Sequence, residues 1–405
     1  MGYPQPISMN SFSLKETNNN MKMLYLYPFD FEKSFLKKDV GLIPKYLVKH
    51  INVDFVYFDD YNINLDVNVF YQDMPGLSTL PIYRKHGKFN KKIKKSVFLV
   101  TNLKMIKYVF KKAKSYTHII MFHYTFTTFI YSLIVKFFNP KSKIWVKMDI
   151  DLKQARSLFD SKSFAKKFLN NIFTKSIDFI SCETIDTYEY LINKNIKGSK
   201  IAYLPDGIDK DEVITKKTIT INKKNTIITV GRLGTFQKNT ELLLDVLSEI
   251  DLGDWNVYII GPYEEKFKEV ICQFFVKNPN LKRNVHFTGA IYDRDLLQIY
   301  FIESKCFMLS SRFESYGLVL NEAMYYKNYI ISTAVGAAPD LIKDEYDGEL
   351  VSPDSNSFRQ ALSHFIANES KIMQKLVERD RDYLFWENIF LESTLFDDFL
   401  KPRED

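Results

Sequence analysis

The sequence predicts an α/β protein with two doubly wound parallel-sheet domains that face each other across a cleft. From Lys22 onward, short runs rich in β-branched and aromatic residues alternate with longer helical stretches, which is typical of βα units around a parallel sheet. The same alternation starts again near residue 225. With 405 residues, of which 46% are apolar, the chain is long enough for two or three domains with cores of their own.

The first half supplies the strands and helices of one predicted domain. A Gly-led loop enters a helix over 39–51, an apolar helix covers 127–138, and an amphipathic basic helix covers 161–177. Twelve residues of helix span only about 18 Å, so we expect the helix at 127–138 to pack against the sheet rather than to enter lipid. The predicted strands are MLYLYPF (23–29), VDFVYFDD (53–60), SVFLVTN (96–102), HIIMFHY (118–124), KIWVKMD (143–149) and IDFISCE (177–183).

The second half repeats this pattern after a break. Pro205 and Gly207 interrupt any regular element, and we place the interdomain linker there. Helices are predicted through LLLDVLSEI (242–250) and GLVLNEAMYY (317–326), and a helical C-terminal segment is expected to pack across both domains. The predicted strands are NTIITVG (225–231), WNVYIIG (255–261), NVHFTG (284–289), KCFMLSS (305–311) and YIISTA (329–334). The expected organisation is a disordered leader (1–20), a first domain (21–204), a second domain (205–380) and a C-terminal helical segment crossing back to the first domain (381–405).

The charge is divided unevenly between the two halves. The net charge is +7, but residues 1–200 hold 32 Lys or Arg against 16 Asp or Glu, and the remainder holds 24 against 33. No acidic residue occurs from Met74 to Met148. Nucleic acid, an anionic membrane surface or an acidic substrate would each be attracted by this basic half, and a lysine-rich solvated face is the alternative. The sequence contains no element that reads nucleic acid, so a nucleic-acid partner is not expected.

The cysteines and the hydropathy of the sequence indicate in which cellular compartment the protein is expected. No window approaches 18 uninterrupted apolar residues, so no membrane-spanning helix is expected. Three scattered cysteines without a C-x-x-C pair offer neither a disulfide framework nor a thiolate metal site. The N-terminus lacks the basic and apolar regions of an export signal. We therefore expect a cytoplasmic protein, either in solution or peripheral on the inner face of the cytoplasmic membrane.

Two sequence segments carry candidate chemistry where strands end and helices begin. RFESYGLVLNEA places Glu314 in a loop and Glu322 eight residues later, inside a helix. Two carboxylates on either side of a helix start can accept hydroxyl hydrogen bonds, and a glycine there lets a phosphate approach the backbone amides. The amides in question belong to Ser315, Tyr316, Gly317 and Leu318.

The second segment, VGRLGTFQKN (230–239), supplies Arg232 and Lys238. Two cations beside a diphosphate would stabilise the charge that builds as a nucleotide departs, and one well-placed donor of this kind lowers a barrier by roughly 3 kcal/mol. No metal would then be required. Each segment alone is more typical of a solvated surface, but together they indicate a cradle for a sugar, a diphosphate and a ribose.

At these residues the sequence resembles the retaining, GT-B fold glycosyltransferases of glycosyltransferase family 4 (glycosyl transferases group 1). The resemblance covers most of the chain from Lys22 and is strongest from Val230 to Pro353. PDGID (205–209) is similar to the usual PNGID of the family, with Asp206 in place of Asn. The spacing of six between Arg232 and Lys238 is one longer than in the commonest form. The segments that carry the resemblance are GRLGTFQKNTELLL, VYIIG, NVHFTGAI, ESYGLVLNE, AVGAAPDLIKDEYDGELVSPD and FWENI.

The resemblance implies roles for these residues. Arg232 and Lys238 would bind the donor diphosphate, and the amides around Gly317 and Leu318 would cap it. Glu314 would contact hydroxyls of the donor sugar near the reacting centre, and Glu322 would hold the ribose hydroxyls.

In the first domain the resemblance is looser. Gly41, in KKDVGLIP, is the candidate for close backbone approach to donor or acceptor, and His123 matches a position where many relatives place a His against the donor sugar. For His123 a structural role is equally open. Lys147, Asp149 and Asp151 in WVKMDID resemble a D-x-D metal motif, but that motif belongs to the other major glycosyltransferase fold, so no metal is expected.

The expected activity is transfer of a sugar, with retention of configuration, from a UDP- or GDP-sugar to a saccharide or lipid-linked saccharide acceptor in surface polysaccharide or glycolipid assembly. The expected mechanism is a front-face substitution in which the leaving phosphate takes the acceptor proton, helped by positioning and electrostatics and by domain closure. No cofactor is expected. The alternative is a non-catalytic partner of the same fold or a sugar-binding subunit of a glycosylation complex. The sequence does not predict an oligomeric state.

Overall fold

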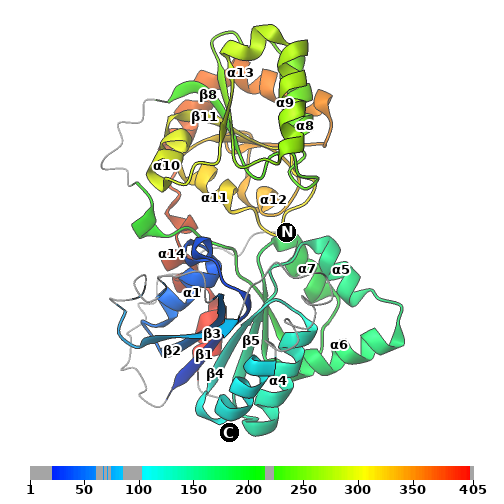
Figure 1. Ribbon diagram of the computed structural model, residues 1–405, viewed down its shortest axis with the longest axis vertical. Helices are drawn as coiled ribbons and strands as arrows, with labels where there is room; N and C mark the ends of the chain where they lie inside the picture. The colour runs from blue at the N-terminus through cyan, green and yellow to red at the C-terminus, as the bar shows by residue number, and fades with distance from the viewer. Residues whose placement is uncertain are drawn as a thin grey trace.

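Two α/β lobes joined by a short waist make up the computed structural model (Figure 1). The structure describes residues 21–60, 67, 71, 74–84, 103–214 and 223–401. Within these residues, seven parallel strands form the first sheet in the order β3-β2-β1-β4-β5-β6-β7. These strands are β1 (Lys22–Asp30), β2 (Asn52–Asp60), β3 (Leu77–Arg84), β4 (His118–Phe122), β5 (Lys143–Lys147), β6 (Phe179–Cys182) and β7 (Lys200–Tyr203).

The second sheet is built in the same way. Its described strands are all parallel and follow the order β10-β9-β8-β11-β12-β13. Their bounds are β8 (Lys224–Val230), β9 (Asn256–Ile260), β10 (Val285–Gly289), β11 (Ser304–Leu309), β12 (Tyr329–Thr333) and β13 (Gly348–Val351). Two doubly wound parallel-sheet domains confirm the predicted fold class.

The strand order changes direction between β1 and β4 in the first sheet and between β8 and β11 in the second. In open α/β sheets, ligands bind beyond the carboxyl ends of the strands at such switch points. The loops that follow these strands are therefore the places to look for a site. The candidate residues Arg232, Lys238 and Glu314 all lie in loops that leave β8 or β11.

Most predicted strands are present, and three further strands were not predicted. The strand expected at 96–102 lies outside the described residues. Strand β3 contains Pro81, which removes a backbone donor and argues against a strand, but β3 is an edge strand where proline is tolerated. Strands β7 and β13 are four residues long and also lie at sheet edges, where their periodicity is too short to recognise.

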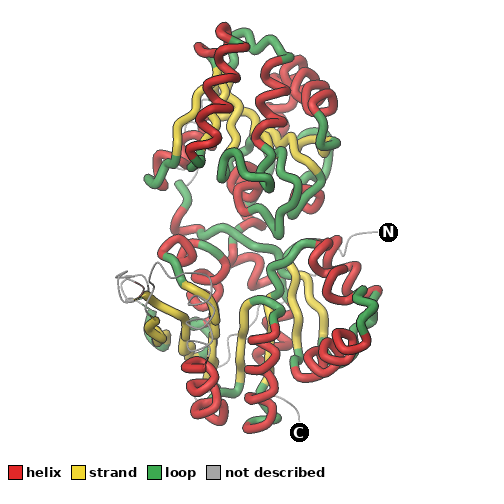
Figure 2. The backbone as a smooth tube through the Cα atoms, turned by 45° about the vertical axis from the view of Figure 1, so that its right-hand side comes forward, coloured by secondary structure: helices red, strands yellow, loops and turns green. Residues whose placement is uncertain are grey.

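Helices cover both faces of each sheet, as Figure 2 shows. In the first domain, α1 and the two C-terminal helices pack on one face, and α4, α6 and α7 pack on the other. In the second domain, α8, α9 and α13 pack on one face, and α10, α11 and α12 on the other. The bounds are α1 (Asp39–Leu47), α4 (Phe126–Phe138), α5 (Leu152–Phe159), α6 (Phe164–Ser176), α7 (Ile185–Asn193), α8 (Thr240–Ser248), α9 (Glu265–Lys277), α10 (Arg294–Glu303), α11 (Leu318–Tyr325), α12 (Ala338–Leu341), α13 (Ser355–Glu378), α14 (Trp386–Glu392) and α15 (Thr394–Leu400).

The expectation that the apolar helix at 127–138 packs against the sheet is correct for one face only. Phe129, Tyr131 and Val135 of α4 are buried in the first-domain core. On the other side of the helix, Phe126 and Phe137 are 66% and 79% exposed. Helix α4 therefore carries apolar side chains on both its core face and its outer face.

The chain crosses between the two lobes twice, and the two crossings lie side by side. Ile208 and Phe385 form a parallel bridge, in which the Ile208 amide donates to the Leu384 carbonyl (2.9 Å) and the Trp386 amide donates to the Ile208 carbonyl (3.1 Å). After the second crossing, α14 and α15 pack into the first-domain core. Trp386 and Phe399 are fully buried there, and the Phe399 ring meets that of Trp145 edge-on at 5.6 Å.

The described residues contain no helix that is both long and apolar enough to cross a membrane. All three cysteines are free thiols: Cys182 and Cys306 are buried, and Cys272 is exposed.

Candidate functional site

The loops that leave β8 and β11 meet at the switch point of the second sheet. The Arg312 amide donates to the Gln237 carbonyl (2.8 Å), and the Ser310 hydroxyl bonds to the carbonyls of Lys238 and Asn239 (3.0 Å each). These contacts lock two loops that lie more than 70 residues apart in sequence. The side chains that project from the two loops are consequently held in fixed positions relative to each other.

Glu314 and Lys238 form an ion pair at this junction. The Lys238 Nζ lies 2.6 Å from Glu314 Oε1, and the side chains of both residues are largely buried. The Ser311 hydroxyl donates to the same oxygen at 2.6 Å. The two residues predicted from separate segments are therefore brought together in one site.

Arg232 joins the group through Gln237, a residue that sequence reasoning missed. An Arg232 guanidinium nitrogen donates to Gln237 Oε1 (2.8 Å), and Gln237 Nε2 donates to Glu314 Oε2 (3.0 Å). Gln237 thus bridges an exposed arginine to a buried carboxylate. Its position directly before Lys238 was the only available signal, because a glutamine in a polar loop carries no pattern of its own.

The start of α11 follows Glu314 directly. Gly317 is its N-cap, with a φ of 91° that side chains rarely adopt, and no side chain caps the helix. Ser315, Tyr316 and Gly317 lie in the turn and Leu318 is the first helical residue, so the predicted cluster of amides lies at a helix N-terminus. The Tyr316 side chain is buried and donates to Asn321 Oδ1 (3.1 Å), and its carbonyl accepts from the Ala337 amide (2.7 Å), so its backbone amide is the group considered for a ligand.

Glu322 lies within α11 and is largely buried. Its carboxylate forms an ion pair with Arg294 at the first turn of α10, a second partner that the sequence did not indicate. Burial lowers the pKa of Arg294. Glu314 precedes α11 and Glu322 is its fifth residue, so the expectation that one ligand contacts both carboxylates stays a prediction.

His123 is in the first domain, directly after β4 at that sheet's own switch point. Its φ is 61°, and Asp149 after β5 has a φ of 46°. The His123 Nδ1 lies 3.7 Å from Asp149 Oδ2 and 3.4 Å from the Met148 carbonyl oxygen. Left-handed backbone at two neighbouring strand ends is strained for residues with side chains, and such strain is concentrated at functional sites. Within the part of the chain that the structure describes, the hydrogen-bond, ion-pair and ring contacts of His123 are to the first domain, and its proposed role towards the donor sugar stays a prediction.

The packing around residue 41 explains why a glycine is needed there. The residue lies inside the first turn of α1 rather than in a loop, and a Cβ there would come within 2.3 Å of the Leu36 carbonyl oxygen. The close backbone approach that the glycine permits is thus to the chain's own backbone. Approach of a ligand to Gly41 stays a prediction.

The three residues of the D-x-D-like segment have separate positions. Asp151 caps α5, accepting from the Gln154 amide at 2.7 Å, and Asp149 lies beside His123. Lys147 is fully buried, with its Nζ 2.7 Å from Glu183 Oε1, 2.9 Å from Asp206 Oδ1 and 3.0 Å from Asp39 Oδ2. Sequence reasoning did not connect these four residues, because they come from four separate segments.

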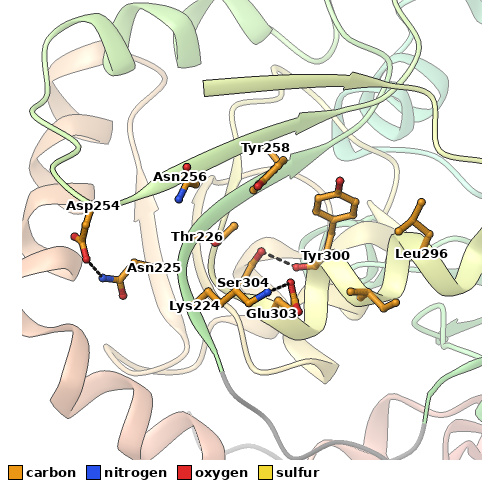
Figure 3. Close-up of a pocket in the computed structure, with 11 residues that line it drawn as sticks. Lys224, Asn225, Thr226, Asp254, Asn256, Tyr258, Leu296, Tyr300, Glu303 and Ser304 are labelled. Atoms are coloured by element: carbon orange, nitrogen blue, oxygen red, sulfur yellow. Dashed lines mark hydrogen bonds and ion pairs between the residues drawn. The ribbon is translucent and has the colours of Figure 1, made fainter. Parts of the chain in front are cut away.

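A groove of about 510 Å³ lies elsewhere in the second domain (Figure 3). Its lining includes Lys224, Asn225 and Asn256, which lie at the amino ends of β8 and β9, and the side chains of α10 that face them. Lys224 pairs with Glu303 (2.7 Å) and Asn225 with Asp254 (2.7 Å). Because parallel sheets bind ligands at the carboxyl ends of their strands, we assign the site to the Glu314 group and not to this groove.

Parts of this chain are similar to known proteins. Residues 210–383 match the family model described as Glycosyl transferases group 1. An uncharacterized 41.2 kDa protein in the cps region of Klebsiella pneumoniae is 30% identical over 228 residues, 53% of this chain and 61% of that protein. The amylovoran biosynthesis glycosyltransferase AmsD of Erwinia amylovora is 32% identical over 149 residues, 36% of this chain and 40% of AmsD. The matched stretches thus span less than two thirds of both relatives.

Among solved structures, Anabaena Alr3699/HepE in complex with UDP is similar with a TM-score of 0.67 at 13% sequence identity, covering 94% of this chain and 99% of that chain. This likeness extends over both lobes and shows the GT-B fold. Residues 210–383, which contain Arg232, Lys238, Glu314 and Glu322, form a glycosyl transferases group 1 domain within that fold.

Proposed function

We propose that the protein is a glycosyltransferase that moves a sugar from a nucleoside-diphosphate sugar to a saccharide or lipid-linked saccharide acceptor. The observation that carries the proposal is the Lys238–Glu314 pair with Arg232 attached through Gln237, at the helix start with Gly317. The group contains two cations, a cluster of amides and one carboxylate, and Glu322 adds a second carboxylate further along α11; a diphosphate, a sugar and a ribose require functional groups of these kinds. A merely sugar-binding partner would not need cations beside the departing phosphate.

The chemistry assigned to this group is stabilisation of the leaving nucleotide. As the bond between the sugar and the phosphate breaks, negative charge builds on the diphosphate. Arg232, Lys238 and the amides at 315–318 would bind that charge, so the proposed reaction needs no metal ion. Glu314 would orient the sugar hydroxyls, and Glu322 would orient the ribose. In many enzymes, preorganised hydrogen-bond donors of this kind make the largest single contribution to stabilisation of the transition state.

The donor and the acceptor are proposed from chemistry and likeness. A UDP- or GDP-sugar is the proposed donor, and the UDP in the Anabaena structure supports the uridine nucleotide. The relatives in the cps region and in amylovoran biosynthesis support a polysaccharide as the product. We propose retention of the anomeric configuration by front-face substitution, with the leaving phosphate taking the acceptor proton.

An anionic membrane surface is the proposed location of the acceptor. Helices α4 and α6 pack together through Ser132 and Ser176, and each leaves apolar side chains exposed. On α6, Phe164 is 84% exposed and its ring stacks with that of Phe168 at 6.5 Å. Lys162, Lys166 and Lys167 are near these residues in the sequence and are exposed. Exposed aromatic rings among lysines are complementary to an anionic bilayer surface, to which each basic residue contributes about 1 kcal/mol.

Thermal shift followed by product analysis tests the function. The protein is screened with nucleotide sugars of each base, and a ligand at 100 times its Kd stabilises the folded state by about 2.7 kcal/mol. The stabilising donor is then incubated with acceptors, and NMR gives the anomeric configuration of the product. Retained configuration supports the proposal, and inverted configuration contradicts the retaining mechanism. No stabilisation by any nucleotide sugar would contradict the donor site itself.

A further inference from the structure

Lys147 is a buried cation among three carboxylates, two from separate parts of the first domain and one from the linker. The side chain is fully buried, and its three carboxylate partners Asp39, Glu183 and Asp206 lie within 3.0 Å. Asp39 is the first residue of α1, Glu183 follows β6, and Asp206 is in the linker to the second domain. All of them meet beyond the carboxyl ends of β5 and β6, where the first domain faces the linker.

The group holds more acidic than basic side chains in a buried place. Three carboxylates surround one ammonium group, and Asp149 acts on them electrostatically as a fourth acid. Burial, opposed by Lys147, raises the pKa of Glu183 to about 7 and that of Asp206 above its usual range. Buried ion pairs contribute little net stability compared with apolar packing, because the loss of hydration offsets their attraction. We therefore ask which parts of the structure this group holds in place.

One thing that the group fixes is the strained turn beside His123. Glu183 Oε1 accepts from Lys147 Nζ at 2.7 Å and from the Asp149 amide at 3.1 Å. The His123 amide in turn donates to the Lys147 carbonyl at 2.9 Å. Both residues with positive φ at this strand edge, His123 and Asp149, are therefore tied to Lys147 or to its partner.

The second thing that the group fixes is the linker. The Asp206 carboxylate accepts from Lys147 in the first domain, and the Asp206 carbonyl accepts from the Asn321 side-chain amide (2.6 Å) in the second. Asn321 is fully buried on α11 and directly precedes Glu322. Four residues thus connect the turn beside His123 to the helix that carries the candidate ribose ligand.

We propose that Lys147, acting through Asp206, is a positioning residue for sugar transfer: it sets the placement of the first domain's His123–Asp149 turn relative to the donor helix α11. The inference rests on the proposed function, since it assigns the two domains to one reaction. It differs from a general stabilising role because Asp206 anchors both domains with two different groups of the same residue.

Asp206 offers the cleaner substitution, because removing Lys147 leaves three buried acids without a cation and can prevent folding. Asp206→Ala removes the linker anchor while Lys147 keeps Asp39 and Glu183. Asp206→Asn keeps a side-chain oxygen that can accept from Lys147. We expect kcat to fall about 100-fold in Asp206→Ala, as for a displacement of about 1 Å between reacting groups, and to stay near the wild-type value in Asp206→Asn. The affinity for UDP, measured by calorimetry, is expected to be unchanged in both.

The matched control is Asp178→Ala. Asp178 pairs with Lys136 at 2.7 Å in the same domain. It precedes β6, whereas Glu183 follows β6, so the two residues lie at opposite ends of this strand. This substitution is expected to lower the melting temperature and leave kcat unchanged. A loss of kcat in the control equal to that in Asp206→Ala would overturn the proposal, because the effect would then be general destabilisation.

A second readout does not depend on catalysis. Amide hydrogen exchange is expected to rise at residues 147–150 and 204–209 in Asp206→Ala, and to match the wild type in Asp206→Asn. Unchanged exchange in Asp206→Ala, or equal effects of the two substitutions, overturns the proposal. If the wild-type protein transfers no sugar from any donor, the proposed function fails, whereas the exchange comparison still decides whether Lys147 and Asp206 set the linker.

Discussion

The Nζ of Lys238 lies 2.6 Å from the Oε1 of Glu314, although the two residues are 76 positions apart in the sequence. The pair joins the loops after β8 and β11, the two strands on either side of the switch point. The two opposite charges pair with each other. A donor that binds here would receive the lysine at its phosphate and the carboxylate at its sugar.

Lys238→Met tests the cationic half of this pair. The substitution removes charge from the proposed diphosphate site, and we expect kcat to fall by about 100-fold or more. Lys305→Met is the matched control. The Lys305 side chain is equally buried, and its ion pair with Glu369 (2.8 Å) lies outside the site. Steady-state kinetics of both variants decides the matter: a similar small effect in each would show that Lys238 is structural.

Gly317→Ala tests the helix start. At a φ of 91°, an alanine is strained by about 1–2 kcal/mol, and its Cβ would approach Leu320 Cδ1 at 3.3 Å. We expect a lower melting temperature together with weaker nucleotide binding, because the turn that presents the amides must shift. Gly253→Ala is the control, since Gly253 also has a positive φ but open space around it. If Gly253→Ala also lost nucleotide binding, the loss in Gly317→Ala could not be attributed to the start of α11.

The stability of the protein is expected to depend on pH through Glu183. Burial is the main cause that raises the pKa of this carboxyl from 4.5 to about 7 in the folded state. Between these values the folded state binds more protons than the unfolded state, so the free energy of unfolding falls as the pH rises, by at most about 1.4 kcal/mol per pH unit. Urea denaturation at several pH values should show this slope in the wild type. The slope should be smaller in Glu183→Gln, and an identical slope would show that another group titrates.

Membrane binding is expected to depend on the exposed rings of α6. Flotation with vesicles that contain anionic lipid should recover the wild type, and Phe164→Ser with Phe168→Ser should weaken the partition on the order of tenfold. Val276→Ser, at a residue 80% exposed on α9 of the other domain, is the control. Equal recovery with neutral and anionic vesicles would contradict the electrostatic part of this proposal.

Sequence patterns predicted the long, regular features of the fold and the parts of the site that lie within one segment. The alternation of strands and helices held for both sheets, and the spacing of Glu314 and Glu322 about the helix start was read directly from one stretch of chain. The edge strands β3, β7 and β13 were missed because a proline or a length of four residues hides their periodicity.

What the sequence did not predict were contacts between distant segments. Gln237 bridges Arg232 and Glu314 only because two loops meet at a switch point, and Arg294 reaches Glu322 from a different helix. In the sequence, Lys147 belongs to a segment that resembles a metal motif, whereas in the structure its side chain is fully buried among carboxylates from other elements. Such partners depend on the tertiary arrangement and leave no local pattern.

We propose that Arg232 and Glu314 act together on a nucleoside-diphosphate sugar, and transfer assays on Glu314→Gln and Arg232→Ala decide whether they do. Each variant is compared with the wild type at saturating donor, with circular dichroism to verify the fold. We expect both variants to remain folded and each to lose about 100-fold or more in kcat. Folded variants that both transfer sugar at nearly the wild-type rate would contradict it.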